Sequence, residues 1–211
     1  MRDKLSLISF ILFGGKHMKI YYLLGKSCSG KSVLYTKLLA DKKLKLTPII
    51  TYTTRPIRRG EKDGKEYHFI TDSQAEELIA SNKVIEKRIY DTEYGKWQYM
   101  TVDDGQFVDT NRYIGIGTLE SYWNMVLKFG SDVVIPIYLE VSPWTIMSRA
   151  MGRLNDDDEK GYLEACRRFI QDTYDYSNEN LIKYKIFTRF DNDLGCGRSA
   201  LTRAKALIGK E

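Results

Sequence analysis

The segment Gly25-Lys26-Ser27-Cys28-Ser29-Gly30-Lys31-Ser32 is the part of the sequence that most constrains the fold of this chain. It has the spacing G-x-x-x-x-G-K-S, in which glycines let the backbone turn its N–H groups inward around a phosphate. A β-rich run precedes it over 20–24, and apolar residues at helical spacing follow over 33–39. A strand, a loop and a helix N-terminus in this order predict a nucleotide-phosphate site.

The chemistry of this motif predicts the donor and its metal. Lys31 is expected to bring a positive charge to the β- and γ-phosphates, which makes it a candidate catalytic residue. The hydroxyl of Ser32 is suited to a Mg²⁺ ligand, so ATP and Mg²⁺ are expected. The candidate ATP contacts are Gly25, Lys26, Ser27, Cys28, Ser29, Gly30, Lys31 and Ser32.

Composition narrows the class of protein. A chain of 211 residues suits one domain, or one domain with a small inserted lobe, and 43% hydrophobic with 29% charged residues argues against disorder and against a membrane protein. The net charge is +5, but the sequence has no long basic block, so arginines gathered around phosphates explain the charge better than nucleic-acid binding does. Three widely spaced cysteines without a C-x-x-C pattern favour a reducing cytoplasm. Oligomeric state stays open.

The first 17 residues form a separate question. Their apolar run over 5–13 resembles a signal peptide but has no small-residue cleavage site and is too short to span a bilayer. The residues from Gly14 to Met18 can be encoded by a sequence with GGAGG, a ribosome-binding site, just before ATG. We therefore expect Met18 to be the natural start and residues 1–17 to be a leader or a mis-assigned start.

Periodicity along the chain predicts alternating strands and helices. The expected strands cover 19–24, 47–52, 67–70, 84–90, 97–102, 112–116, 133–139 and 184–190. The expected helices cover 31–40, 73–79 (capped by Asp72 or Ser73), 119–129, 143–152 (with Ser142-Pro143 as cap and first residue), 161–174 and 197–208. The acidic run 155–160 between two of these helices is interpreted as a solvated loop.

This pattern predicts an α/β fold with a parallel sheet flanked by helices. The expected core covers 18–51 and 105–211. A small, mostly β lobe is expected at about 52–104.

Residues 53–69 read T-T-R-P-I-R-R-G-E-K-D-G-K-E-Y-H-F. This segment resembles the signature of the guanylate kinase family, T-T-R-x-x-R-x-G-E-x-x-G-x-x-Y-x-F, at every fixed position. Together with the phosphate loop, the resemblance extends from about Lys19 to the C-terminus and indicates a divergent P-loop nucleoside monophosphate kinase. It implies transfer of the γ-phosphoryl group of ATP to GMP, which gives GDP and ADP.

The resemblance also implies roles for individual residues. Two arginines three positions apart, with a tyrosine hydroxyl, can hold a monophosphate dianion through charge-assisted hydrogen bonds. Glu86 would accept from the N1–H and 2-amino groups of guanine. The lobe at about 52–104 would be the monophosphate-binding part, and a helical lid at about 149–168 would carry arginines that neutralise charge on the transferred group. The implied acceptor residues are Thr51, Arg55, Arg58, Tyr67, Glu86, Tyr94 and Lys96, and the implied catalytic residues are Lys31, Arg149, Arg153 and Arg168.

Two departures from the family pattern concern the base. After the tyrosine-glycine pair the family has Ser or Thr, whereas this chain has Lys96. The family also has a D-x-D pair in the next strand, which assists base recognition and magnesium, whereas residues 114–118 read I-G-I-G-T. Two alternatives therefore stay open: a related kinase with a different nucleotide or a phosphorylated sugar as acceptor, and a catalytically silent binding module. The intact Lys31 and Ser32 argue against the silent module.

Overall fold

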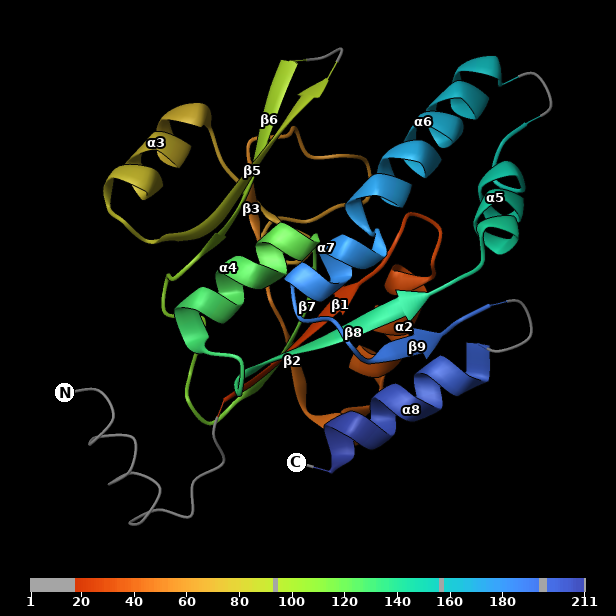
Figure 1. The fold of residues 1–211 in the computed structure, drawn as a ribbon. Coiled ribbons are helices and arrows are strands. Elements are labelled where there is room, and N and C mark those ends of the chain that lie inside the picture. Colours follow the sequence, from red (N-terminus) through yellow and green to blue (C-terminus); the bar gives the residue numbers. More distant parts are fainter. Residues whose placement is uncertain (1–17, 93–94, 156–157, 194–196, 211) are drawn as a thin grey trace. The chain divides into compact units, whose positions relative to one another are not determined.

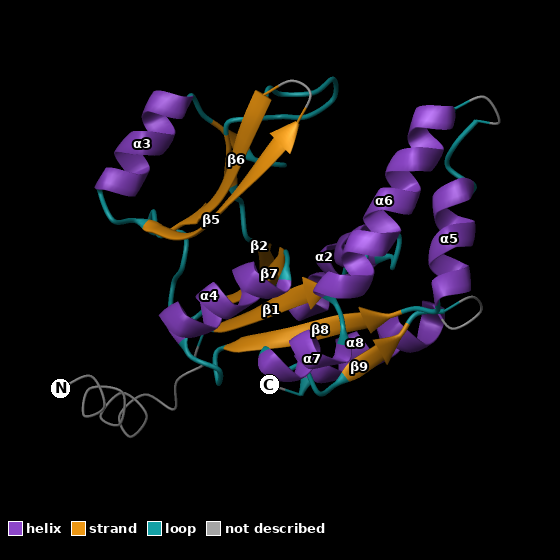
Figure 2. Cartoon of the chain, turned by 45° about the horizontal axis from the view of Figure 1, so that its top comes forward, coloured by secondary structure: helices purple, strands orange, loops and turns teal. Residues whose placement is uncertain are grey.

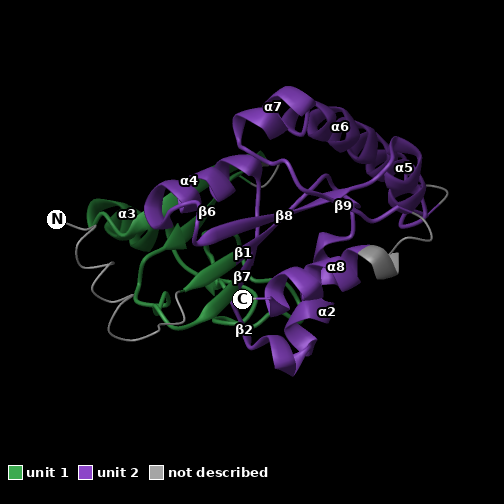
Figure 3. Ribbon diagram, turned by 60° about the horizontal axis from the view of Figure 1, so that its bottom comes forward, with its two compact units in different colours: residues 1–20, 49–113 green, residues 21–48, 114–211 purple. Residues whose placement is uncertain are grey.

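The structure is a computed structural model that describes residues 18–92, 95–155, 158–193 and 197–210 (Figure 1). Two compact units divide the chain (Figure 3). Unit 1 contains the described part of Met1–Ile20 together with Ile49–Tyr113, and unit 2 contains Tyr21–Pro48 together with Ile114–Glu211. The expected leader at 1–17 lies outside the described residues.

A five-stranded sheet in the order β2-β7-β1-β8-β9 forms the centre of the α/β fold, and β8 runs parallel to β9 (Figure 2). This arrangement confirms the predicted fold class. Its strands are β1 (Lys19–Leu24), β2 (Leu46–Pro48), β7 (Arg112–Ile116), β8 (Val134–Glu140) and β9 (Arg189–Asp191). The helices of unit 2 are α2 (Lys31–Ala40), the 3₁₀ helix Lys42–Leu44, α4 (Leu119–Phe129), α5 (Pro143–Met151), α6 (Glu159–Asp175), α7 (Asn178–Lys183) and α8 (Gly197–Gly209).

Strand β1 is buried on both faces because helices cover both sides of the sheet. Tyr21 and Leu23 belong to the core cluster that also contains apolar residues of α2 and α8. Tyr22, which points to the opposite face, contacts Tyr122 of α4 with ring centroids 6.2 Å apart, and its hydroxyl donates to Ser121 at 3.0 Å. None of the helices in the described ranges has both the length and the apolar run that crossing a membrane requires.

Unit 1 contains a four-stranded sheet in the order β4-β3-β6-β5. Strand β3 is parallel to β4 and antiparallel to β6, and β5 pairs antiparallel with β6, with an irregularity in register between Val84 and Glu86. Ala75 of helix α3 packs against Met100 and Val102 of β6. The elements are β3 (Tyr52–Thr53), β4 (His68–Phe69), α3 (Asp72–Ala80), β5 (Val84–Thr92) and β6 (Gly95–Val102).

Several predicted elements have the expected bounds. Strands β1 and β7 and helices α2 and α4 begin and end where periodicity placed them. Helix α5 begins with Pro143 at its first position, and the Ser142 hydroxyl accepts from the Thr145 amide at 3.2 Å. Local sequence was sufficient for these elements.

Two predicted strands were wrong. The run 47–52 is not one strand, because β2 ends at Pro48 in one sheet and β3 begins at Tyr52 in the other. The run 184–190 is a strand only over Arg189–Asp191, and the helix α7 that precedes it was missed. The Ser177 hydroxyl accepts from the Asn180 amide and starts this helix, and the left-handed backbone of Lys185 follows its end.

Two boundaries also differ from the prediction. The cap of α3 is Thr71, whose hydroxyl accepts from the Gln74 amide while the Gln74 side chain accepts from the Thr71 amide. Neither predicted cap residue has that position. The acidic run 155–160 is not all loop, because Asp158 caps α6 by accepting from the Gly161 amide at 2.9 Å and the helix starts at Glu159.

Candidate functional site

The loop between β1 and α2 has backbone conformations that favour glycine. Gly25 and Gly30 have φ angles of 143° and 96°, and Gly30 stands directly before α2 without a side-chain cap. A Cβ at Gly25 would lie 2.8 Å from the carbonyl oxygen of Leu139. A Cβ at Gly30 would lie 2.5 Å from Nδ2 of Asn192. The local geometry therefore requires both glycines of the motif.

Lys31 lies against the loop that precedes it. Its Nζ donates to the carbonyl oxygens of Gly25 and Lys26 at 2.6 and 2.8 Å. Burial lowers the pKa of the Lys31 ammonium to about 8, whereas the charges of Asp172 and Cys28 act to raise it. The loop backbone thus positions the ammonium beside the amides that the motif directs at a phosphate.

Ser32 is exposed in the first turn of α2. Its hydroxyl is a hard oxygen donor of the kind that Mg²⁺ prefers, and the remaining ligands of such a site are phosphate oxygens and water. Across the part of the chain that the structure describes, no group of three or more His, Cys, Asp or Glu could hold a metal ion. The donor set at Ser32 therefore fits a Mg²⁺ ion that arrives with a nucleotide.

Asp172 is a loop contact that was not predicted. Its carboxylate, on helix α6, accepts a hydrogen bond from the backbone N–H of Ser27. An internal carboxylate therefore binds to one of the loop amides that the motif predicts for phosphate. The two residues are 145 positions apart in sequence, and periodicity carries no signal for such a contact.

Arg149, one of the arginines predicted to lie on a lid, contacts the loop. Its Nη1 donates to the carbonyl oxygen of Cys28 at 3.2 Å, and its Nη2 donates to that of Asn192 at 2.8 Å. The side chain of Asn192 in turn donates to the carbonyl oxygen of Ser29 at 2.7 Å. These bonds attach the phosphate loop to α5 and to the segment after β9.

The other two predicted lid arginines do not join this network. Arg168 pairs with Glu164 on its own helix, with Nε 2.6 Å from the carboxylate, and its side chain is 60% exposed. Arg153 is exposed in the turn after α5. Arg168 is one helical turn from Asp172 on the same face of α6, because residues four apart are neighbours on a helix. Within unit 2, Arg168 is therefore about 6 Å along the helix axis from a residue that contacts the loop.

In unit 1, Arg55 forms the centre of a cluster around the signature segment. Its side chain is only 4% exposed, and Nη2 donates to both carboxylate oxygens of Glu61 at 2.8 and 3.0 Å. The guanidinium lies over the rings of Tyr67 and Phe69, 5.4 and 5.6 Å from their centroids. Glu61 is a fixed position of the signature, but the sequence analysis did not predict that it would pair with Arg55.

Three predicted acceptor residues surround this cluster. The centroid of the Tyr67 ring lies 5.7 Å from that of the Tyr99 ring, and burial raises the pKa of the Tyr67 hydroxyl. Arg58 is exposed; its backbone N–H donates to the Glu61 carboxylate at 2.8 Å, and its carbonyl oxygen accepts from the Glu61 amide at 3.1 Å. Thr51, between β2 and β3, accepts from the His68 amide through its carbonyl oxygen at 2.9 Å. The structure therefore brings Arg55, Arg58 and Tyr67 to one loop region, with Thr51 at its edge.

Glu86, the predicted guanine-reading carboxylate, is already bound by protein groups. Arg88 donates to it through Nε and Nη2 at 3.0 and 3.2 Å, and the Thr101 hydroxyl donates at 2.7 Å. Its side chain is 1% exposed. The sequence reading did not consider Arg88, although residues two apart on a strand point to the same face.

The remaining positions that were predicted to contact the base have different surroundings. Lys96 is exposed on β6, opposite Asp91 in the hairpin, and Tyr94 lies outside the described residues. At Gly117, the second glycine of the I-G-I-G-T segment, a Cβ would overlap the hydroxyls of Tyr22 and Ser121. The hydrogen-bonded side chains of Tyr22 and Ser121 therefore fill the space that an acidic side chain would need at this position.

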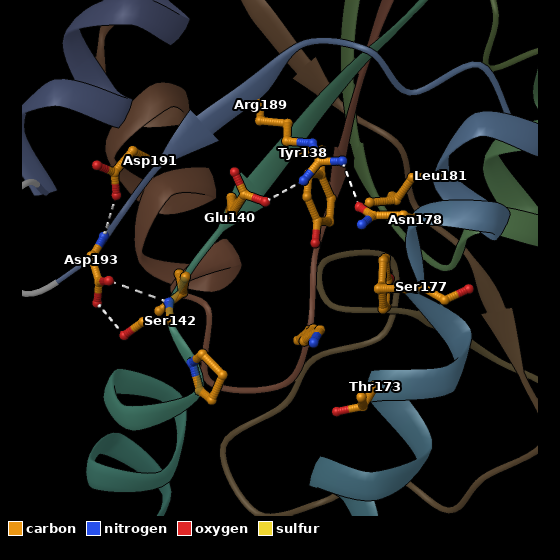
Figure 4. Close-up of a pocket in the computed structure, with 14 residues that line it drawn as sticks. Tyr138, Glu140, Ser142, Thr173, Ser177, Asn178, Leu181, Arg189, Asp191 and Asp193 are labelled. Carbon is orange, nitrogen blue, oxygen red and sulfur yellow. Dashed lines mark hydrogen bonds and ion pairs between the residues drawn. The ribbon is translucent and has the colours of Figure 1, made fainter.

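A cavity of about 760 Å³ adjoins the phosphate loop within unit 2 (Figure 4). Its wall includes Lys26 of the loop, charged residues of β8 and β9, and Asn178 and Leu181 of α7. Arg189 pairs with Glu140 at 2.6 Å and donates to Asn178 at 2.8 Å. Because Arg189 is paired with Glu140, the cavity is not included in the candidate phosphate site.

The fold and the loop together define the class of protein. A parallel sheet flanked by helices, with a G-x-x-x-x-G-K-S loop between β1 and α2, is the architecture of P-loop kinases. The fold resembles that of a crystal structure of guanylate kinase from Anaplasma phagocytophilum, with a TM-score of 0.57 over 93% of this chain and 87% of that one, at 16% sequence identity.

Sequence comparison gives the family. The guanylate kinase family model matches residues 17–103. Guanylate kinase from Shewanella denitrificans is 38% identical over 145 residues, which cover 66% of this chain and 67% of that protein. This chain therefore belongs to the guanylate kinase family.

Other relatives match over shorter stretches. Guanylate kinase from Schizosaccharomyces pombe is 40% identical over 73 residues, or 35% of this chain and 36% of that protein. Guanylate kinase from Protochlamydia amoebophila is 34% identical over 109 residues, or 50% and 51%. The chain thus aligns with between a third and a half of these two proteins.

Proposed function

We propose that this protein transfers the γ-phosphoryl group of ATP to GMP and releases ADP and GDP. One observation carries the proposal: a chain of this family combines a phosphate loop containing a partly buried Lys31 in unit 2 with the Arg55–Tyr67 cluster in unit 1. The loop supports binding of a nucleoside triphosphate. The cluster supports binding of a second, dianionic phosphate.

On the donor side, the loop amides and Lys31 bind the phosphates of ATP. Ser32 would hold a Mg²⁺ ion together with those phosphates, and such an ion would supply positive charge there. Arg149, which already contacts the carbonyl oxygen of Cys28, supplies a further positive charge next to the loop. These groups stabilise negative charge on the phosphoryl group as it is transferred.

On the acceptor side, Arg55 and Arg58 bind the phosphate of GMP, and Tyr67 donates its hydroxyl. Burial raises the pKa of that hydroxyl, so it stays a donor at neutral pH. Glu61 keeps the guanidinium of Arg55 oriented through two hydrogen bonds. Thr51, Tyr94, Lys96 and Glu86 complete the proposed acceptor set.

The reaction itself needs positioning rather than a covalent enzyme intermediate. An oxygen of the GMP phosphate attacks the γ-phosphorus of ATP. The bond from the γ-phosphorus to the β–γ bridging oxygen breaks, and ADP takes the electron pair. Because the attacking phosphate is already a dianion, no base has to remove a proton.

The segment of about 149–168 is proposed to act as the lid. Arg153 and Arg168 are exposed on it, and their side chains bind the phosphates when the lid closes and excludes water. We also propose a cytoplasmic location, because Cys28 and Cys166 are free thiols.

A second candidate is a kinase of the same reaction type with another acceptor. The observation that favours it is the state of the base-reading groups: Glu86 is paired with Arg88, and Lys96 stands where the family has Ser or Thr. A silent binding module is not favoured, because the loop is intact.

The test is a comparison of GMP, dGMP, AMP, UMP, CMP and ribose bisphosphate as acceptors with ATP and Mg²⁺, by product analysis at steady state. We expect GMP and dGMP to be phosphorylated with the highest kcat/KM. Higher kcat/KM for another acceptor would replace GMP with the second candidate. No turnover of any acceptor would reject both.

A further inference from the structure

The pairing of Glu86 with Arg88 is a feature of this chain that the proposed reaction does not explain. Both residues are on β5, two positions apart, so their side chains point to the same face of the sheet. The guanidinium binds the carboxylate through two nitrogens, at 3.0 and 3.2 Å, with side-chain exposures of 17% for Arg88 and 1% for Glu86. Thr101, directly opposite Glu86 on β6, donates a third hydrogen bond at 2.7 Å.

This face also carries the aromatic residues next to the proposed phosphate site. Tyr99 is the register partner of Arg88 on β6, and its ring lies 5.7 Å from that of Tyr67. The ring of Tyr90, next along β5 on the same face, lies 5.5 Å from that of Tyr99. Arg88 therefore belongs to the acceptor face of unit 1 and not to its exterior.

The carboxylate of Glu86 has two oxygens, and both already accept from charged or hydroxyl donors. Guanine would offer two neutral donors, the N1–H and the 2-amino group, in place of the guanidinium. Charge-assisted hydrogen bonds to an ionised donor are roughly twice as strong as neutral ones, and a buried carboxylate that loses its cation is costly. Exchange of Arg88 for guanine is therefore unfavourable relative to binding of guanine by an unoccupied carboxylate.

We propose that Arg88 sets the base selectivity of the acceptor site by occupying the carboxylate of Glu86. This inference rests on the proposed function, because it assigns the acceptor base to this face. It follows that the wild-type protein discriminates weakly between GMP and IMP, which differ in the 2-amino group that Glu86 would read. Removal of the guanidinium frees the carboxylate for that amino group.

The test compares equilibrium binding of GMP and IMP by calorimetry in the wild type and in Arg88→Ala. Binding is nearly equal for the two nucleotides in the wild type, and the substitution raises the preference for GMP about tenfold or more, the scale of one hydrogen bond to a charged group. Lys87→Ala is the matched control, because Lys87 is the exposed neighbour on the opposite face of β5. An unchanged or lower preference in Arg88→Ala overturns the proposal.

A double variant separates release of Glu86 from a general loosening of the sheet. In Glu86→Gln/Arg88→Ala the gain in GMP preference is lost, because no carboxylate remains to read the amino group. Persistence of the gain overturns the proposal. If circular dichroism shows that Arg88→Ala does not fold, Arg88→Gln takes its place with a smaller rise in the same direction, and absence of that rise also overturns it.

The binding readout is independent of catalysis. If the wild type turns over no nucleotide while Arg88→Ala still gains preference for GMP, the proposed reaction fails and the role of Arg88 stands. If the wild type phosphorylates GMP but the GMP-to-IMP ratio does not respond to Arg88→Ala, the proposed reaction stands and the role of Arg88 fails.

Discussion

The phosphate loop of unit 2 and the acceptor cluster of unit 1 both have their ligand-binding groups bound by the protein itself, but by different means. In the loop, Lys31 donates to two backbone carbonyls. In the cluster, Arg55 and Glu86 are each held by a side chain of opposite charge. A side chain that is held by backbone carbonyls keeps its position when neighbouring side chains are substituted. A side chain that is held by an ion pair loses its partner when one residue is substituted. A single substitution can therefore alter the acceptor cluster, whereas the contacts of Lys31 depend on the backbone of the loop.

The largest expected effect is on the donor side, from Lys31→Ala. This change removes the charge that is proposed to contact the β- and γ-phosphates and should lower kcat by about 10³-fold, while the fold is retained. Steady-state phosphoryl transfer and circular dichroism measure the two properties. Lys37→Ala, exposed on the same helix, is the control. Near-normal turnover in Lys31→Ala would falsify the role of the loop.

A smaller effect is expected on the acceptor side, from Glu61→Gln. The loss of the carboxylate leaves the buried guanidinium of Arg55 without its ionic partner, so KM for the acceptor should rise about 10- to 100-fold and the free energy of unfolding should fall by about 1–3 kcal/mol. Acceptor saturation curves and urea unfolding measure these changes, with Glu76→Gln on the exposed face of α3 as control. An unchanged KM would mean that Arg55 does not need an ion pair for its orientation.

The exception on the donor side is Asp172, a side-chain anion that binds to the loop. Asp172→Asn removes a negative charge that competes with phosphate for the Ser27 amide, so the Kd for MgATP should fall about tenfold. Calorimetric titration at pH 7 measures it, and Asp175→Asn, exposed on the same helix, is the control. Weaker binding in Asp172→Asn would show instead that the carboxylate assists the nucleotide.

The smallest effect is that of pH on nucleotide affinity. The pKa of Lys31 is lowered to about 8, so the ammonium that binds phosphate is lost in the free protein as pH rises through this value. Affinity for MgATP should therefore fall about threefold between pH 7.5 and 8.5, where the phosphates themselves are already ionised. Calorimetry across this range tests the slope, which Lys31→Ala should lack. An equal slope in that variant assigns the titration to another group.

The parts of the fold that follow from short segments could be predicted from sequence. The strand, loop and helix around Gly30 depend on local periodicity and on glycine conformation, and their bounds were right. The run 47–52 failed because its apolar residues are typical of one strand, although the chain leaves one sheet for another within it. The strand expected over 184–190 failed because the chain turns at Lys185, whose φ is 58°, and pairs with β8 only over Arg189–Asp191. The short helix before it was missed because its polar first residues also suit a turn.

The same distinction applies to the site. Arg55 and Tyr67 were predictable because the signature places them 12 positions apart in one segment, and the structure brings them into contact. Asp172 was not predictable, because its contact with Ser27 joins distant parts of the chain. Strand alternation could have predicted that Arg88 lies on the same face as Glu86. The family pattern did not indicate this contact, because it covers the residues that match it and not a charged neighbour that changes their chemistry.

The hydrogen bond between Tyr22 and Ser121, next to Gly117, limits the order in which these three residues can be substituted. An aspartate introduced at Gly117 alone would overlap two hydroxyls in a packed interior, where excess volume costs about 1–3 kcal/mol. Truncation of Ser121 to glycine and of Tyr22 to a smaller residue would first have to open the space, at the cost of a cavity. A route that restores an acidic pair to this strand therefore passes through less stable intermediates, whichever residue changes first.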